Sequence, residues 1–423
     1  MAYMVNMILV AIVVCSIVKG TAAKGAQVQN NDNSEQFALL CRIYNVAKNP
    51  TIHHVDLQDP LKIVNEINAF NASFIDEKQF NETEDVVNSS DAQIKHTTTR
   101  EAAVAQAILS RITKKAHKIL VEIKRVNDTR YIEKVKAEFS QVIFGEGRNE
   151  SDLCDGVLKG VGERGAACGI SGLSHKGNYA GKNLVVDFFC LCAQRTKNGN
   201  NEGMDNVCGV QVGGKSKGDY QGWGDAAPLG SPSMWASIKK ECSKLLHKHP
   251  ESTEEGHEIL KDFLKHLEMG GVYRWGSSGK DSGRKEGMLG TSVGTNEIGD
   301  EPGPVCNGKK GNNRDTHTSG ICVYYGPNKW EENIDWLKKL KNALASLESV
   351  NHQTATIQRD IEKLHMLLHR AEQIYETTKV ITEMQNPKGL TAFPNATPKR
   401  RTAYNAAWRH NQHAHFILLV VLL

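Results

Sequence analysis

The sequence has few aromatic residues, no excess of either charge, and no apolar run long enough for a transmembrane helix. Aromatic side chains make up 6% of the 423 residues. The 52 Lys and Arg residues are nearly balanced in number by 48 Asp and Glu residues. A transmembrane helix needs about 20 apolar residues in succession. Because a nucleic-acid-binding protein normally presents a strongly basic face, the charge balance argues against that class. Few aromatics are expected where helical bundles dominate over large cores.

The N-terminus has the order of a secretory signal peptide. An apolar run from Ile8 to Val18 is followed by the small residues Ala22 and Ala23, although no basic residue precedes it. A buried N-terminal helix is the alternative, but the run has no amphipathic period. We predict a signal peptide over residues 1–23 and a helical ectodomain over residues 24–385.

Nine of the ten cysteines remain once Cys15 leaves with this signal. In a secreted chain they predict a disulfide framework, with one thiol left free or paired between chains. Spacing does not determine the connectivity. The candidates are Cys41, Cys154, Cys168, Cys190, Cys192, Cys208, Cys242, Cys306 and Cys322.

Six N-x-S/T sequons indicate the same extracellular compartment. Three of them crowd into a polar stretch that we expect to be an exposed loop. The candidate N-glycosylation sites are Asn71, Asn81, Asn88, Asn127, Asn149 and Asn395.

One long helix is predicted from Ile334 to Met384. Its apolar residues recur at steps of three and four, and neither Gly nor Pro interrupts it before Pro387. A helix of this length extends about 75 Å and cannot bury its apolar stripe alone.

A second apolar stripe starts near residue 97, slips in phase between Asn127 and Arg130, and ends at Gly145. We predict a mostly α fold in which helices at about 97–143 and 330–384 form an elongated antiparallel two-helix coiled-coil hairpin. Two separate amphipathic helices on a compact core are the alternative.

Residues 146–328 are rich in Gly and hold eight of the nine remaining cysteines, which predicts a disulfide-tied head. We expect helices at Pro232–Leu246 and Ser252–Leu267, a short strand at Asn183–Leu191, and loop elsewhere, notably at Gly276–Lys310.

Ahead of the first rod we expect a helix at Ser34–Lys48, with Ser34 as its N-cap, and a second helix at Pro60–Phe74. The polar segment Asp76–His96 is expected to be loop.

The C-terminus has the order of a GPI-attachment signal. Residues 386–405 read as a polar linker, small residues at Asn405–Ala407 precede a polar spacer, and Phe416–Leu423 is apolar. We predict attachment at Asn405, with Ala406 and Ala407 as alternatives, and removal of residues 406–423.

Several short motifs suggest chemistry but lack the flanking elements that the chemistry needs. Gly209–Ser216 spells a P-loop, and Gly160–Gly165 spells GxGxxG without a flanking strand or helix. Cys190, Cys192 and Cys208 could bind zinc, but their spacing in the sequence is not that of a zinc ribbon. His365 and His369 lie one turn apart and are expected on a solvated flank. We predict no enzyme activity, no cofactor and no metal site.

Two segments resemble a known family. Phe37–Pro50 is similar to the N-terminal helix of the variant surface glycoproteins of African trypanosomes. Gly320–Tyr325, followed by Ile334–Leu340, resembles the same family. Because no Cys follows Cys322, the likeness is closest to members that lack a large Cys-rich C-terminal domain.

This resemblance implies a GPI-anchored ectodomain on the outer face of the plasma membrane that forms homo-oligomers, most often dimers. In this family, many copies pack into a dense coat on the cell surface, which sterically shields other surface proteins from host antibodies. Antigenic variation then replaces one coat variant with another. The alternative is a low-copy GPI-anchored receptor that binds a host ligand on the same scaffold.

Overall fold

The computed structural model describes most of residues 26–385. The residues outside the description within that range are 54, 57, 84–99, 127–128, 171–175, 198–199, 202, 217–218, 246–251, 277–280, 295–303 and 312–317. The chain divides into two compact units, Met1–Leu61 with Lys118–Lys363, and Lys62–His117 with Leu364–Leu423. We describe each unit by itself.

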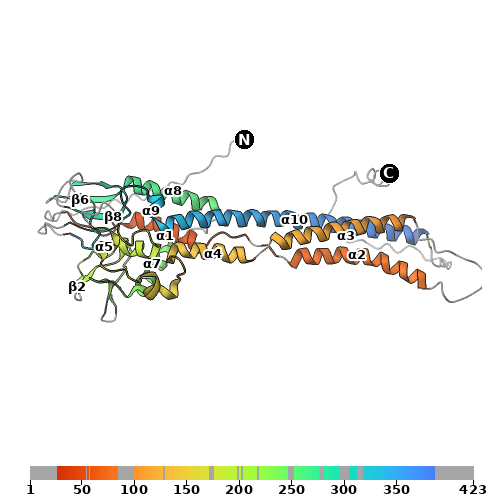
Figure 1. Ribbon diagram of the computed structural model, residues 1–423, viewed down its shortest axis with the longest axis horizontal. Helices are drawn as coiled ribbons and strands as arrows, with labels where there is room; N and C mark the ends of the chain where they lie inside the picture. The colour runs from red at the N-terminus through yellow and green to blue at the C-terminus, as the bar shows by residue number, and fades with distance from the viewer. Residues whose placement is uncertain are drawn as a thin grey trace, which may run out of the picture. The chain divides into compact units, whose positions relative to one another are not determined.

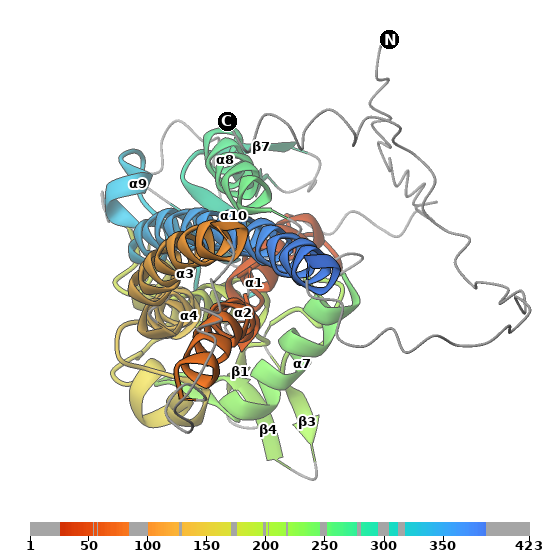
Figure 2. The ribbon, with the colours of Figure 1, turned by 90° about the vertical axis from the view of Figure 1, so that its right-hand side faces the viewer.

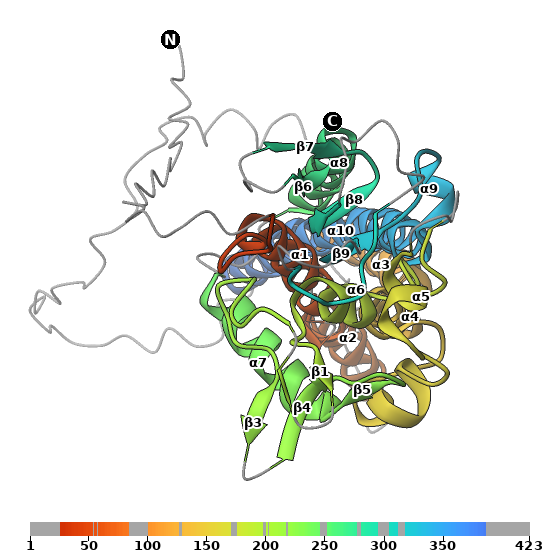
Figure 3. The same ribbon diagram turned by 90° about the vertical axis from the view of Figure 1, so that its left-hand side faces the viewer.

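Helix α1 (Ser34–Lys48) lies at the centre of the first unit. Ten of its fifteen residues are buried. It packs against α4 (Thr129–Phe144), α6 (Leu184–Cys192), α7 (Ser231–Lys244) and α8 (Thr253–Met269). Figure 3 shows α1 with α6, α7 and α8 around it. The predicted bounds of this helix are confirmed, but its N-cap is Asn33 rather than Ser34.

The segment predicted as a strand at Asn183–Leu191 is helix α6. Asn183 caps it, since the Asn183 Oδ1 accepts from the Val186 backbone N at 2.9 Å. All nine residues of α6 are buried, so no polar face marks a helical period. A short, mainly apolar run that is buried on every side does not distinguish helix from strand by its period, which is why the prediction was wrong.

A four-stranded sheet lies in the segment where we expected loop. The strand order is β7-β6-β8-β9, in which β6 and β8 are parallel and the other pairs are antiparallel. Its strands are β6 (Gly271–Trp275), β7 (Asp281–Lys285), β8 (Met288–Val293) and β9 (Ser319–Tyr324). Strand β9 packs on α6, so the sheet covers one side of the core.

Smaller elements complete this unit. Two minor sheets contain β1 (Thr196–Lys197) with β2 (Asn200–Asn201), and β3 (Gly214–Ser216) with β4 (Asp219–Trp223) and β5 (Pro228–Leu229). The short helical turns are η2 (Glu150–Asp152), η3 (Leu153–Val157), α5 (Arg164–Cys168) and α9 (Trp330–Asn333). The two helices expected in the head are confirmed as α7 and α8.

Parts of three helices form the second unit: α2 (Gln58–Thr83), α3 (Arg100–Val126) and α10 (Asp335–Gln385) (Figure 1). Phe70 of α2 stacks on Tyr375 of α10, with ring centroids 5.2 Å apart. The Asn68 side chain of α2 lies 3.0 Å from His117 Nε2 of α3. Helix α2 therefore lies beside both long helices, as the end-on view in Figure 2 also shows. It extends nine residues beyond the predicted Phe74, into the segment expected to be loop.

The long C-terminal helix is confirmed as α10, a single helix of 51 residues. The first rod is two helices, because α3 ends at Val126 and α4 begins at Thr129. Within α3, Val104 is 42% exposed, whereas Leu109 is fully buried. Helix α2 packs on α3 as a third helix, which the two-helix prediction did not include, so the side of α3 that is covered differs from the prediction. The architecture is more than a two-helix hairpin. Pairing of the two rods along their whole length stays a prediction.

Candidate functional site

Four disulfides tie the first unit together. They pair Cys41 with Cys242, Cys168 with Cys190, Cys192 with Cys208, and Cys306 with Cys322. The first joins α1 to α7 across 201 residues of chain, whereas the others span 16 to 22 residues. The three cysteines considered for zinc are all engaged in these bonds. Cys154 is the unpaired cysteine among the described residues, and it is exposed.

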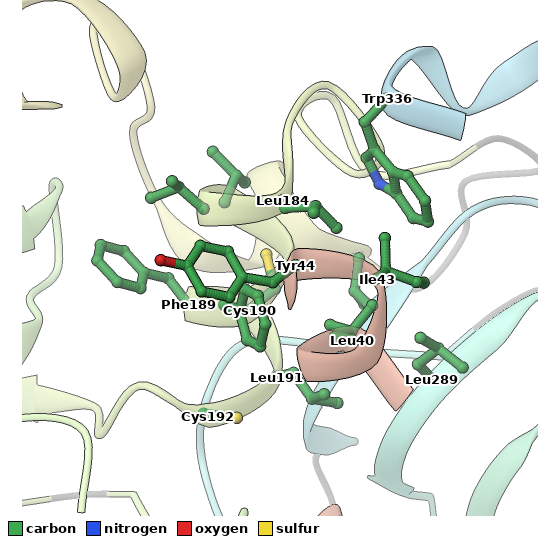
Figure 4. Packing of buried hydrophobic residues seen from close by; sticks show 14 of the residues in the cluster. Leu40, Ile43, Tyr44, Leu184, Phe189, Cys190, Leu191, Cys192, Leu289 and Trp336 are labelled. Atoms are coloured by element: carbon green, nitrogen blue, oxygen red, sulfur yellow. The ribbon is translucent and has the colours of Figure 1, made fainter. Parts of the chain in front are cut away.

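Figure 4 shows how the disulfide-linked core is packed around α1 and α6. Leu40, Ile43 and Tyr44 of α1 lie among Leu184 and Phe189 of α6, and all are buried. Cys190 and Cys192 lie at the end of the same helix, so two disulfides link α6 to the end of α5 at Cys168 and to the turn at Cys208. These covalent links thus lie within the buried apolar core.

Asp187 is a fully buried carboxylate in the middle of α6. Its Oδ1 accepts from the Gly181 backbone N at 2.9 Å, and its Oδ2 accepts from the Tyr325 hydroxyl at 2.9 Å and Trp336 Nε1 at 2.6 Å. Burial raises the pKa of Asp187 to about 7, although the three donors oppose the shift. The residue connects α6, the end of β9 and the start of α10.

Arg164 opens α5 and lies within the GxGxxG motif. It is fully buried and donates to the carbonyl oxygens of Cys190 at 2.7 Å and Ala193 at 2.5 Å. These carbonyls lie at the C-terminal end of α6, where a cation is favoured by the helix dipole. Burial lowers the pKa of Arg164 to about 9. Contrary to expectation, a short helix does begin within the motif, at Arg164, but the side chain of this first residue packs inward as a structural cap.

The P-loop-like motif ends in a strand. Gly214–Ser216 forms β3, in which Lys215 pairs with Tyr220 of β4. Phosphate binding by such a motif requires a helix that starts at its last residues. The backbone here has the conformation of a hairpin.

A cavity of about 380 Å³ lies where α1, the end of α8 and the sheet meet. Two of its titratable side chains, Glu35 and His266, are 3.2 Å apart and form a pair with each other. The Arg284 guanidinium donates to the Gly270 carbonyl at 3.3 Å. Its lining residues are Glu35, Gln36, His266, Met269, Gly270, Arg284 and Leu289.

The histidines singled out on α10 are both exposed, as expected. His369 Nε2 lies 3.0 Å from Gln373 Nε2 on the same helix. Within the described ranges, no three His, Cys, Asp or Glu side chains gather in a way that could hold a metal ion. No helix in that part of the chain has the apolar length that a membrane crossing requires.

The predicted modification sites are only partly covered by the structure. Asn71 is half-buried in α2, and Asn149 is exposed at the start of η2. Asn81 lies in α2, but its side chain is outside the description. Several predicted features lie outside the described residues. They are the signal at residues 1–23, the sequon residues Asn88 and Asn127, and the linker and tail at residues 386–423, which include Asn395 and the attachment residue Asn405.

The structure defines a mostly helical, disulfide-bonded protein, with four disulfides among the described residues. The particular family follows from comparison with known families. Residues 12–102 and 79–366 match the model of the trypanosomal VSG domain, so the chain belongs to that family. This confirms the resemblance carried by Phe37–Pro50 and the segment after Gly320.

One curated relative is similar over part of its length. The chain is 26% identical to variant surface glycoprotein YnAT 1.3 of Trypanosoma congolense over 212 residues. The match spans 50% of this chain and 44% of the relative.

Proposed function

We propose that this chain is a surface coat glycoprotein that forms a steric shield at the plasma membrane. The observation that carries the proposal is the family match, which extends over most of residues 12–366. Four disulfides suit an extracellular compartment, where they persist. In this proposal the role is structural. The coat shields other surface proteins from antibodies, and replacement of one coat variant by another provides immune evasion by antigenic variation.

The anchor belongs to the same proposal. A GPI group on Asn405 would hold the chain to the outer membrane leaflet after residues 406–423 are removed. The attachment signal in the sequence supports this, with a small site, a polar spacer and an apolar tail. Self-association as a dimer would bring copies together at the surface, where host antibodies would meet only their outermost loops.

Release by a GPI-specific phospholipase tests the anchor. Cells displaying the full chain are treated with the enzyme, and we expect the protein to move from the cell pellet to the supernatant. A matched variant with Leu418→Arg and Leu419→Arg breaks the apolar tail and should fail to reach the surface. Retention of the unaltered protein on treated cells would contradict a GPI anchor.

Abundance tests the coat. Surface biotinylation of cells that express the chain from its own locus should label it as the dominant surface protein. A scarce labelled band would instead favour a receptor and refute the shield, because a shield works only at high density.

A further inference from the structure

We propose that Asn149 carries an N-linked oligosaccharide in the folded protein and that Asn71 does not, although both lie in intact N-x-S sequons. The inference requires passage through the secretory pathway but not the coat function. It depends on the different settings of the two asparagines, which are the sequon residues whose side chains the structure describes.

Asn149 projects from a turn on the surface of the first unit. Helix α4 ends at Phe144, and Gly145, with φ +89°, turns the chain away from it. Asn149 then has an extended backbone, with φ −147° and ψ −179°, and caps the short helix η2. The residue is exposed.

The hydrogen bonds of Asn149 leave its amide nitrogen available. Its Oδ1 accepts from the Ser151 backbone N at 2.9 Å and from the Ser151 hydroxyl at 2.6 Å. Within the described part of the chain, the Asn149 Nδ2 donates to no partner. Replacing one of its hydrogens by a sugar therefore breaks no hydrogen bond to the described residues.

The surroundings of Asn149 suit a carbohydrate. Arg148 pairs with Asp152 at 3.0 Å, and Glu150 pairs with Lys239 of α7. These charged groups are partly exposed and offer donors and acceptors to sugar hydroxyls. The oligosaccharide would lie over η2 and the adjoining outer side of α7.

Asn71 has the opposite setting. It follows Ile63 and Ile67 at steps of four on α2, and those two side chains are 3% and 0% exposed. The Asn71 Oδ1 is shielded from solvent and accepts no hydrogen bond from the described residues. The hydroxyl of its sequon residue Ser73 donates to the Ala69 carbonyl at 2.9 Å. Asn71 is half-buried beside this stripe, so an oligosaccharide attached there would compete with the packing of α2 against its neighbours.

The modification is a group transfer without oxidation or reduction. A bond forms between the Asn149 Nδ2 and the anomeric carbon of a sugar supplied by a lipid-diphosphate oligosaccharide. The sugar–phosphate bond of that donor breaks, the lipid diphosphate leaves, and the amide loses one proton.

Site-resolved mass spectrometry tests the proposal. The full chain is expressed in a eukaryotic secretory host, recovered in folded form, and digested with peptide-N-glycosidase in H₂¹⁸O, which marks each occupied Asn as ¹⁸O-labelled Asp. We expect the label at position 149 and none at position 71. Ser151→Ala should remove the label at position 149, Ser151→Thr should retain it, and Ser73→Ala should leave the pattern unchanged.

Two results would overturn the inference. One is an occupied Asn71 in the folded, secreted protein. The other is an unlabelled Asn149 in a sample whose Ser151→Thr variant is also unlabelled. Because occupancy is read peptide by peptide, the four other sequons do not affect either outcome.

Discussion

The indole nitrogen of Trp336 donates a 2.6 Å hydrogen bond to the Asp187 carboxylate, across 149 residues of sequence. Both side chains are fully buried, and the Trp336 ring also packs edge-on against Phe263 of α8 at 4.8 Å. The first turn of α10 is thereby attached to α6 and α8 by polar and apolar contacts together. The long helix thus starts from a fixed point in the core.

The pH dependence of stability should carry the signature of Asp187. Its carboxyl has a pKa of about 7 in the folded chain, against 3.8 as the ordinary value. Between about pH 4 and 7 the folded chain holds a proton that the unfolded chain has lost, so this group's contribution to stability rises as pH falls. The slope is at most about 1.4 kcal/mol per pH unit.

Urea unfolding at pH 5, 6 and 7 measures this slope in the unaltered chain, in Asp187→Asn, and in Asp155→Asn as an exposed control. We expect the first substitution to remove the Asp187 contribution and the control to keep it. An unchanged slope in Asp187→Asn would show that the carboxylate stays ionised throughout.

Trp336→Phe should destabilise the first unit by about 1–3 kcal/mol. The substitution keeps an aromatic ring against Phe263 but removes one of the three donors that satisfy a buried carboxylate. Trp330→Phe is the matched control, since the indole of Trp330 donates to the Gly326 carbonyl at a half-buried position. Thermal unfolding should rank Trp336→Phe as the more damaging change, and equal midpoints would argue against a special role for the Asp187 contact.

Asn33→Asp should cost about 3 kcal/mol or more. The buried Asn33 amide donates to the carbonyl oxygens of Leu191 and Ile321, at 2.9 and 2.8 Å, and accepts from the Thr291 hydroxyl at 3.0 Å. A carboxylate of the same shape would direct an oxygen at two carbonyls in a dry site. Denaturant titration of this variant beside the exposed Asn328→Asp measures the difference, and similar free energies of unfolding for the two would refute the role of the amide.

Removing the disulfide between Cys41 and Cys242 should destabilise the protein by about 2–5 kcal/mol, more than removing that between Cys306 and Cys322. The first closes a loop of 201 residues and the second one of 16, and the entropy lost by the unfolded chain grows with loop length. Double Cys→Ser variants compared by thermal unfolding give the order. The reverse order would mean that local strain or residual structure outweighs chain entropy.

Cys154 should react with a maleimide in the folded protein, while the paired cysteines should not. It is exposed, and the other eight cysteines from Cys41 to Cys322 are in disulfides. Peptide mapping without reduction should locate the label at position 154 and lose it in Cys154→Ser. Label on any of the other eight would contradict the pairing.

Helices with a periodic apolar face could be predicted from the sequence, whereas an element buried on every side, such as α6, and strands paired over long sequence distances could not. The bounds of α1 and the length of α10 follow from their periodicity and from stops at Asn49–Pro50 and Pro387. Helix α6 was mistaken for a strand because it is buried on every side and its residues show no helical period, although Asn183 ahead of the run was an N-cap signal. The sheet was missed because β6 to β9 are Gly-containing segments whose pairing depends on partners far away in sequence.

The same limit applies to the candidate site. Nine cysteines could be named from the sequence, but their pairing depends on which backbones come within bonding distance. Asp187, Arg164 and Asn33 carried no signal of their role, because a buried polar residue is recognised by its partners. The motifs at Gly160–Gly165 and Gly209–Ser216 show the opposite case. Their sequences match phosphate-binding patterns, but the backbone around them does not have the phosphate-binding conformation.

The central place of α1 has a consequence for biosynthesis. This helix leaves the ribosome early, but its partners α4, α6, α7 and α8 follow over the next two hundred residues and more. Ten side chains that end up buried therefore remain exposed to solvent during synthesis. Until Cys242 has been synthesised, the Cys41 thiol is either reduced or held in a non-native disulfide. Maturation of the nascent chain should consequently depend on chaperones and on thiol–disulfide exchange until translation has passed α8.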